Sequence, residues 1–193
     1  VLEQNKDYLT ELDAAIGDAD HGINMNRGFQ KVVSQLPSVA DKDISNILKT
    51  VSMTLISSVG GASGPLYGTL FLRTSTAVAG KSELSNVDMV ALLQAAVDGV
   101  VQRGKANLGD KTMLDALSPA SDAFKQAVDG GASTLEALQQ AVVAAEEGMK
   151  NTIPLVAKKG RASYLGDRSA NHQDPGATST YLILKSLLET VSG

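Results

Sequence analysis

Apolar residues recur every three or four positions along most of the chain, which is the spacing of one face of an α-helix. Gly or Pro interrupts these stretches, and no strand-like alternation exceeds four residues. Connections between the stretches are short, so consecutive helices should be antiparallel. The pattern therefore predicts an all-α fold of about eight helices, at approximately 3–12, 24–36, 43–59, 64–79, 85–101, 113–128, 133–149 and 175–191.

Local signals support several of these boundaries. Ser85 with Asp88, and Ser133 with Glu136, have the three-residue spacing of a capping box at a helix start. Pro65 suits the first turn of a helix, where its missing N–H costs nothing. Neither a low-complexity linker nor an internal repeat divides the chain, so we predict one domain over residues 1–193.

Composition narrows the functional classes. Hydrophobic residues make up 43% and charged residues 20%, as in globular proteins, whereas aromatic residues reach only 4%, which suits helix packing by aliphatic side chains. The chain has no Cys, which excludes disulfides, thiolate metal sites and a cysteine nucleophile, and fits a cytoplasmic protein. A net charge of -4 without a basic stripe argues against a nucleic-acid partner. The apolar runs are too short for a membrane span of roughly 20 residues.

Candidate chemistry lies in the polar segments between the helices, first in residues 13–22. Asp13, Asp18 and Asp20 lie close together there, flanked by glycines. On one straight helix, Asp13 and Asp18 would point about 140° apart, at roughly 100° per residue. A turn that folds back would instead bring the three carboxylates together, and their mutual repulsion favours a hard divalent cation as partner. A solvated turn with an Asp helix cap is the alternative.

Residues 60–68, Gly-Gly-Ala-Ser-Gly-Pro-Leu-Tyr-Gly, open a predicted helix. Small side chains let an anion approach the backbone N–H groups at a helix N-terminus, where the helix dipole favours negative charge. Taken alone, this segment fits a Gly-rich turn between two helices better.

Residues 99–105 nearly spell the phosphate-binding motif G-x-x-x-x-G-K. Ala106 stands where that motif requires Ser or Thr, and the segment lies at the end of a helix, so we reject it. Residues 109–113, Gly-Asp-Lys-Thr-Met, indicate a loop and a helix start that Thr112 can cap.

Residues 158–178 form a long basic segment without clear periodicity, and long irregular loops are more often functional than idle. Arg161 and Arg168 carry guanidinium groups suited to phosphate. A solvated surface loop is the alternative. No Gly-x-Ser-x-Gly elbow or His-Glu-x-x-His zinc motif occurs, so we predict no catalytic nucleophile.

Residues 17–22, 58–65, 109–113, 160–166 and 172–178 are specific in combination. Together they resemble the nucleotide-binding L subunits of dihydroxyacetone kinases, over essentially the whole chain. The resemblance implies a barrel of eight antiparallel helices with the nucleotide site at one end. It also implies two magnesium ions that bridge the phosphates of ADP or ATP to a carboxylate triad, which Asp13, Asp18 and Asp20 match.

The resemblance further assigns the residues that contact the nucleotide. They come from the segment after the carboxylates, two turns in the middle of the chain, and the basic segment with the turn that follows it. These residues are His21, Gly22, Ile23, Asn24, Ala62, Ser63, Gly104, Thr112, Met113, Arg161, Asp174, Pro175 and Gly176.

The activity that the resemblance implies is phosphoryl transfer within the phosphotransferase-system form of the kinase. Bound ADP is rephosphorylated by a phosphohistidine on an M subunit, and the γ-phosphate passes to dihydroxyacetone held on a separate K subunit. Family members carry more chain before the first Asp than the twelve residues here, so we expect part of the first helix to be missing.

Two other functions fit the same residues. One is an ATP-dependent kinase domain of the glycerone or fatty-acid type, and the other is a nucleotide-sensing regulatory module. Transfer from a phosphohistidine donor would distinguish a phosphotransferase-system subunit from a sensor, which would bind ADP and transfer nothing. Tight retention of ADP would distinguish the phosphotransferase-system subunit from an ordinary kinase, which would exchange ADP for ATP.

Overall fold

The computed structural model describes residues 1–193 and contains no strand, so the prediction of an all-α fold is confirmed. Eight α-helices are joined by turns and by two 3-10 helices. Their bounds are α1 Lys6–Ile16, α2 His21–Gln35, η1 Leu36–Ser38, α3 Ile44–Ser58, α4 Ser63–Ala77, α5 Asn86–Gly104, α6 Leu114–Asp129, α7 Thr134–Asn151, η2 Arg161–Ser169 and α8 Pro175–Ser192.

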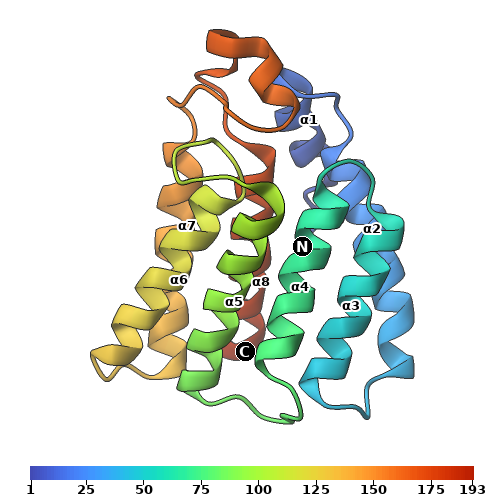
Figure 1. Cartoon of the computed structure of the whole chain (residues 1–193), viewed down its shortest axis with the longest axis vertical. Coiled ribbons are helices and arrows are strands. Elements are labelled where there is room, and N and C mark those ends of the chain that lie inside the picture. Colours follow the sequence, from blue (N-terminus) through green and yellow to red (C-terminus); the bar gives the residue numbers. More distant parts are fainter. The chain divides into compact units, whose positions relative to one another are not determined.

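The chain divides into two compact units. The first comprises Val1–Ile23 and Ala106–Gly193, and the second comprises Asn24–Lys105. In the second unit, α3, α4 and α5 lie side by side and antiparallel (Figure 1). Apolar side chains from these helices form its core, among them Leu55, Tyr67, Leu93 and Val100.

In the first unit, α6, α7 and α8 pack against one another, and α1 contacts both α8 and η2 (Figure 1). Phe124 is fully buried, and the other buried apolar residues of this unit are mostly alanines and aliphatic residues. Alanines make up many of the buried residues of α6 and α7, which contact each other, and such small side chains allow helices to approach closely. These buried alanines are Ala116, Ala120, Ala127, Ala137, Ala141 and Ala145.

Both predicted capping boxes are present. The Ser85 N–H donates to the Asp88 carboxylate at 3.0 Å, and the Asp88 N–H donates back to the Ser85 hydroxyl at 3.3 Å. Ser133 and Glu136 repeat this reciprocal pair at the start of α7. A helix N-cap of this kind stabilises by about 1 kcal/mol.

Several boundaries differ from the sequence prediction by three residues or more, among them the start of α1 at Lys6 and the end of α5 at Gly104. Helix α1 continues past residue 12 to Ile16, and α2 begins at His21 rather than at Asn24. Residues 161–169, predicted as an irregular loop, form the 3-10 helix η2, which a glycine interrupts at Gly166 (φ 55°, ψ -131°). The early start of α2 was missed because a carboxylate of α1, described below, caps this helix.

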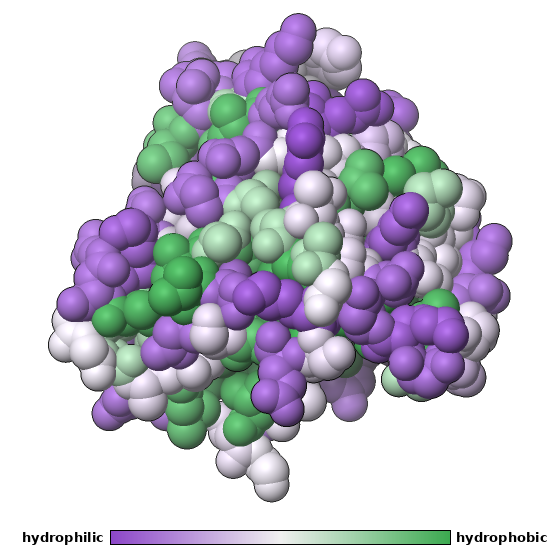
Figure 2. All heavy atoms as spheres, turned by 60° about the horizontal axis from the view of Figure 1, so that its bottom comes forward, coloured by the Kyte–Doolittle hydropathy of each residue, from purple (hydrophilic) through white to green (hydrophobic).

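The surface mixes polar and apolar residues. On the face drawn in Figure 2, hydrophilic groups are spread widely and the hydrophobic ones form separate smaller clusters. None of the helices combines the length and apolar character that crossing a membrane requires.

Candidate nucleotide and metal site

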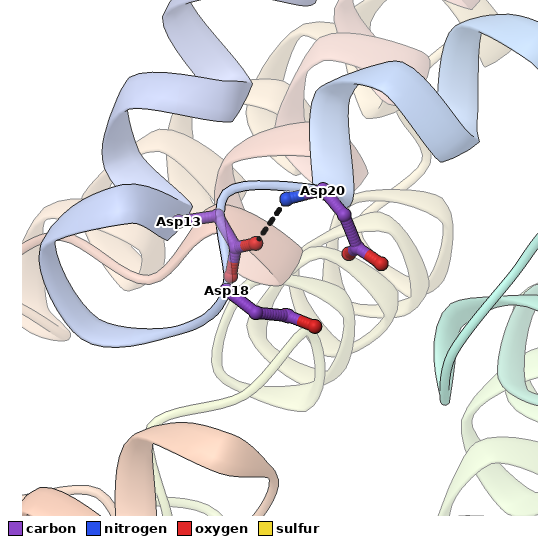
Figure 3. A group of neighbouring side chains, drawn as sticks. All are labelled: Asp13, Asp18 and Asp20. Carbon is purple, nitrogen blue, oxygen red and sulfur yellow. Dashed lines mark hydrogen bonds between the residues drawn. The ribbon is translucent and has the colours of Figure 1, made fainter.

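The turn between α1 and α2 folds back on itself, as the sequence predicts. Asp13 belongs to α1, whereas Asp18 and Asp20 lie in the turn that follows it (Figure 3). One carboxylate oxygen from each of the three lies within 4.8 Å of the other two. This donor set of hard, anionic oxygens fits a divalent cation such as magnesium.

Asp13 also builds the turn that holds the other two carboxylates. Its Oδ2 accepts a hydrogen bond from the backbone N–H of Asp20 at 2.9 Å (Figure 3) and another from the N–H of His21 at 3.2 Å. The first N–H groups of α2 therefore have a buried anionic cap. A Cβ at Gly17 would lie 2.1 Å from the Asp13 Oδ1, so only glycine leaves room for this carboxylate.

Asp18 forms an ion pair with Arg161 of η2. The Arg161 Nε lies 2.9 Å from the Asp18 Oδ2, and the two side chains are 68% and 35% exposed. An ion pair this exposed contributes little to the stability of the fold. Its significance is positional, because the predicted phosphate-binding guanidinium lies beside a predicted metal ligand.

His21 is buried, and its Nε2 lies 2.9 Å from the Ser179 hydroxyl oxygen of α8. Burial lowers the pKa of His21 below its usual value, although the charges of Asp13 and Asp20 act in the opposite direction. The ring is therefore neutral near pH 7, and it ties the start of α2 to α8. Its contact with nucleotide stays a prediction.

Gly22 and Ile23 follow in the first turn of α2. A Cβ at Gly22 would lie 2.0 Å from the carbonyl oxygen of Lys6 and 2.5 Å from the Thr10 hydroxyl oxygen. Glycine is thus required here by the close approach of α2 to α1. Ile23 is 49% exposed.

The loop before α6 and the start of α8 are adjacent although they are far apart in sequence. A Cβ at Gly176 would lie 3.4 Å from the Met113 nitrogen, which brings two predicted nucleotide-binding segments together. The Thr112 hydroxyl accepts the N–H of Leu114, the first residue of α6, at 3.2 Å, but the N-cap residue of this helix is Met113 rather than the predicted Thr112. Pro175 occupies the first turn of α8.

Asp174 caps α8, since its Oδ2 accepts the Ala177 N–H at 2.7 Å. Burial raises the pKa of Asp174 to about 7, against the effect of that hydrogen bond. The charge of Asp115 raises the pKa further, whereas Lys111 lowers it. Asp174 is therefore held in a site that only just supports its charge near neutral pH.

The remaining predicted contacts belong to the second unit. Helix α4 starts at Ser63 after the N-cap residue Ala62, and no side chain caps it. The Asn24 Oδ1 accepts a hydrogen bond from the Arg27 guanidinium at 2.7 Å. Gly104 is the last residue of α5.

Comparison with known proteins decides the family. A family model described as "DAK2 domain" matches residues 15–189. The chain belongs to the DAK2 domain family. This confirms the resemblance to dihydroxyacetone kinase that the sequence motifs indicate.

Relatives of this DAK2 chain include proteins of nearly the same length. It is 50% identical over 187 residues to the Escherichia coli (strain K12) protein named "PEP-dependent dihydroxyacetone kinase, ADP-binding subunit DhaL", covering 97% of this chain and 89% of that one. It is 42% identical to a Listeria innocua protein named as the ADP-binding subunit of PEP-dependent dihydroxyacetone kinase 2, with coverages of 99% and 89%.

A solved structure has the same fold. The dihydroxyacetone kinase of C. freundii, in complex with AMP-PNP and Mg2+, matches with a TM-score of 0.73 and 25% identity. The match covers 98% of this chain but 31% of that kinase, so the DAK2 chain spans about a third of its length.

Sequence reasoning missed two residues that organise the loop before α6 of this DAK2 chain. The Asp115 carboxylate accepts the N–H groups of Gly109, at 2.6 Å, and Thr112, at 2.7 Å. The spacing of Thr112 and Asp115 was a usable signal, because it resembles a capping box. Lys111 carries no such signal, since nothing in the sequence marks a lysine as buried.

Proposed function

We propose that this chain is the ADP-binding subunit of a phosphoenolpyruvate-dependent dihydroxyacetone kinase, with residues 1–193 acting as one nucleotide-binding domain. It accepts phosphate from a phosphohistidine on an M subunit, and it passes that phosphate to dihydroxyacetone on a separate K subunit. The carboxylate cluster beside Arg161 carries the proposal, because it occurs in a chain 50% identical to a protein named as such a subunit.

Asp13, Asp18 and Asp20 are the residues that would hold magnesium, and we propose two ions. Support comes from three carboxylates whose oxygens lie within 4.8 Å of one another, and from the Mg2+ in the complex of the C. freundii kinase. Magnesium would neutralise the phosphate charges of the nucleotide and stabilise the charge that develops during transfer.

The side chains of this chain position the reactants. Asp13 holds the carboxylate turn in place through its two backbone hydrogen bonds, and Arg161 places a guanidinium beside Asp18. Phosphoryl transfer depends chiefly on positioning and charge stabilisation, so the site needs no nucleophile from this chain. Thr112, Met113 and the Asp174–Gly176 turn would contact the nucleotide from the adjacent segments.

Reconstitution of the phosphate relay tests this proposal. The purified chain, loaded with ADP and magnesium, is combined with K and M subunits and a phosphoenolpyruvate-fed phosphohistidine donor, and dihydroxyacetone phosphate is measured. We expect sustained product formation without added ATP. Product only when free ATP is supplied would instead indicate an ATP-dependent kinase domain, and ADP binding without any transfer would indicate a nucleotide sensor.

A further inference from the structure

Lys111 is the most completely buried cation of the chain, with 1% of its surface exposed. It lies between Asp110 and Thr112 in the loop before α6, and its backbone adopts the left-handed conformation, with φ at 63°. A non-glycine residue in that conformation is uncommon and is retained where the surroundings enforce it.

The Lys111 ammonium group is surrounded by backbone carbonyl oxygens. Three belong to the residues that follow α7, and a fourth belongs to His172, two residues before the cap of α8. The Nζ donates to the carbonyls of Thr152 at 2.9 Å, Ile153 at 3.3 Å, Leu155 at 3.0 Å and His172.

This arrangement places a positive charge where a helix needs one. The helix dipole makes the C-terminal end of α7 negative. The carbonyls of Thr152, Ile153 and Leu155 that Lys111 binds belong to the C-cap residue of α7 and to residues just beyond it, so the ammonium lies at this negative end. These hydrogen bonds spare the buried ammonium the large cost of an unpaired charge. Because its N–H donors all face carbonyls, Lys111 is not available to bind a phosphate itself.

The four carbonyls lie near the two ends of the segment 152–174, which includes η2 and Arg161. Two further hydrogen bonds also join these two ends to each other. The Asn171 N–H donates to the Ile153 carbonyl at 2.7 Å, and the Asp174 N–H donates to the Thr152 hydroxyl at 3.0 Å. Lys111 therefore joins the end of α7 to the approach to α8.

We propose that Lys111 is a positioning residue for nucleotide binding, whose buried ammonium group fixes both ends of the segment that carries Arg161. The inference rests on the proposed function, because it is through Arg161 and the Asp174–Gly176 turn that this order would reach the nucleotide. Without the charge, the segment would sample more conformations, and binding would have to supply the cost of ordering it.

The absence of cysteine from the chain allows a test that changes only the charge. Lys111→Cys provides a single thiol, which is alkylated in denaturant before the protein is refolded. Bromoethylamine restores an ammonium group on a chain of lysine length, whereas 1-iodopropane gives a neutral side chain of the same length. Wild-type protein taken through the same steps is the reference.

Two readouts are compared, the Kd for magnesium-ADP by calorimetry and hydrogen exchange without nucleotide. We expect the ammonium form to bind within about threefold of wild type and the neutral form to bind at least about tenfold more weakly, as loss of preorganisation requires. Exchange in the neutral form should rise within 152–174 and stay unchanged in α3, α4 and α5.

Equal affinity of the two alkylated forms would overturn the inference, as would faster exchange throughout the chain. A neutral form that fails to regain its helical circular dichroism, while the ammonium form refolds, would also overturn it, because the charge would then serve the whole fold. Failure of wild-type protein to bind magnesium-ADP would instead refute the proposed function.

Discussion

Two turns of this molecule have similar backbone requirements but differ in charge. The turn between α1 and α2 and the turn between α3 and α4 both lead into a helix whose first turn contains a glycine. A Cβ at Gly22 would lie 2.0 Å from the Lys6 carbonyl oxygen, and a Cβ at Gly64 would lie 2.3 Å from the Val59 carbonyl oxygen. In each case glycine lets the new helix approach the backbone before it.

The turns differ in charge and in how the next helix is capped. The first turn carries Asp18 and Asp20, and Asp13 of the preceding helix caps α2, whereas the second turn is uncharged and no side chain caps α4. Left-handed backbone is supplied by Ala19 in the first turn (φ 61°) and by Gly61 in the second (φ 63°). The comparison teaches that the shared glycines serve packing, whereas packing does not account for the carboxylates at the first turn, which we propose hold a metal ion.

Removing one charge from the first turn should have the largest effect. We expect Asp18→Asn to lower the rate of phosphoryl transfer by roughly a thousandfold, because a neutral amide is a poor ligand for magnesium and several kcal/mol of transition-state stabilisation rest on that ion. The melting temperature without metal should change little, since Asp18 contributes only an exposed ion pair with Arg161.

Asp129→Asn is the matched control for this substitution. Asp129 is also a partly exposed carboxylate with one ion pair, to Lys125 of α6, but it lies outside the candidate site. Its transfer rate should equal that of wild type. Near-normal transfer by the Asp18 variant would show that this residue only shapes the turn.

The second prediction concerns what the two turns share. Gly22→Ala and Gly64→Ala should each destabilise the fold by roughly 1–3 kcal/mol, because the added methyl group meets backbone atoms that cannot move aside. Denaturant unfolding followed by circular dichroism measures both. Gly130→Ala is the control, since its Cβ would make only ordinary contacts at 3.4 Å. A loss of stability in only one of the two glycine variants would contradict the claim that both glycines are required for packing.

The smallest effects should come from substitutions at Gly61 and Ala19, the two residues of these turns with left-handed backbone. Gly61→Ala should lower the free energy of unfolding by about 1 kcal/mol through backbone strain alone, since no atom lies within 4 Å of the added Cβ. Ala19→Gly should raise it by up to about 1 kcal/mol, because glycine relieves the same strain. Paired denaturant titrations test the opposite signs, and the same sign for both would contradict the account.

The fold was largely predictable, because its signals are local. All eight helices follow from apolar spacing and from Gly or Pro at their ends, and both capping boxes lie within four-residue windows. The early start of α2 was missed because its cap is the Asp13 side chain, eight residues before His21. Sequence spacing does not reveal a cap that arrives from a preceding helix.

The candidate site was predictable in its residue types and only in part in its arrangement. A straight helix would point Asp13 and Asp18 apart, and the folded-back turn expected from this geometry is present. The ion pair of Asp18 with Arg161 and the carbonyl contacts of Lys111 join residues that are at least 41 positions apart in the chain. No local sequence pattern encodes such contacts. Such contacts depend on how the helices pack.

The most direct test of the account is a calorimetric titration of the chain with ADP, with magnesium and with EDTA in its place. Three carboxylates and a diphosphate repel one another unless cations lie between them. We predict that ADP binds with magnesium and that its affinity falls at least about a hundredfold in EDTA, or about 2.7 kcal/mol. Undiminished affinity for ADP in EDTA would contradict the claim that the carboxylate turn is a metal site for nucleotide.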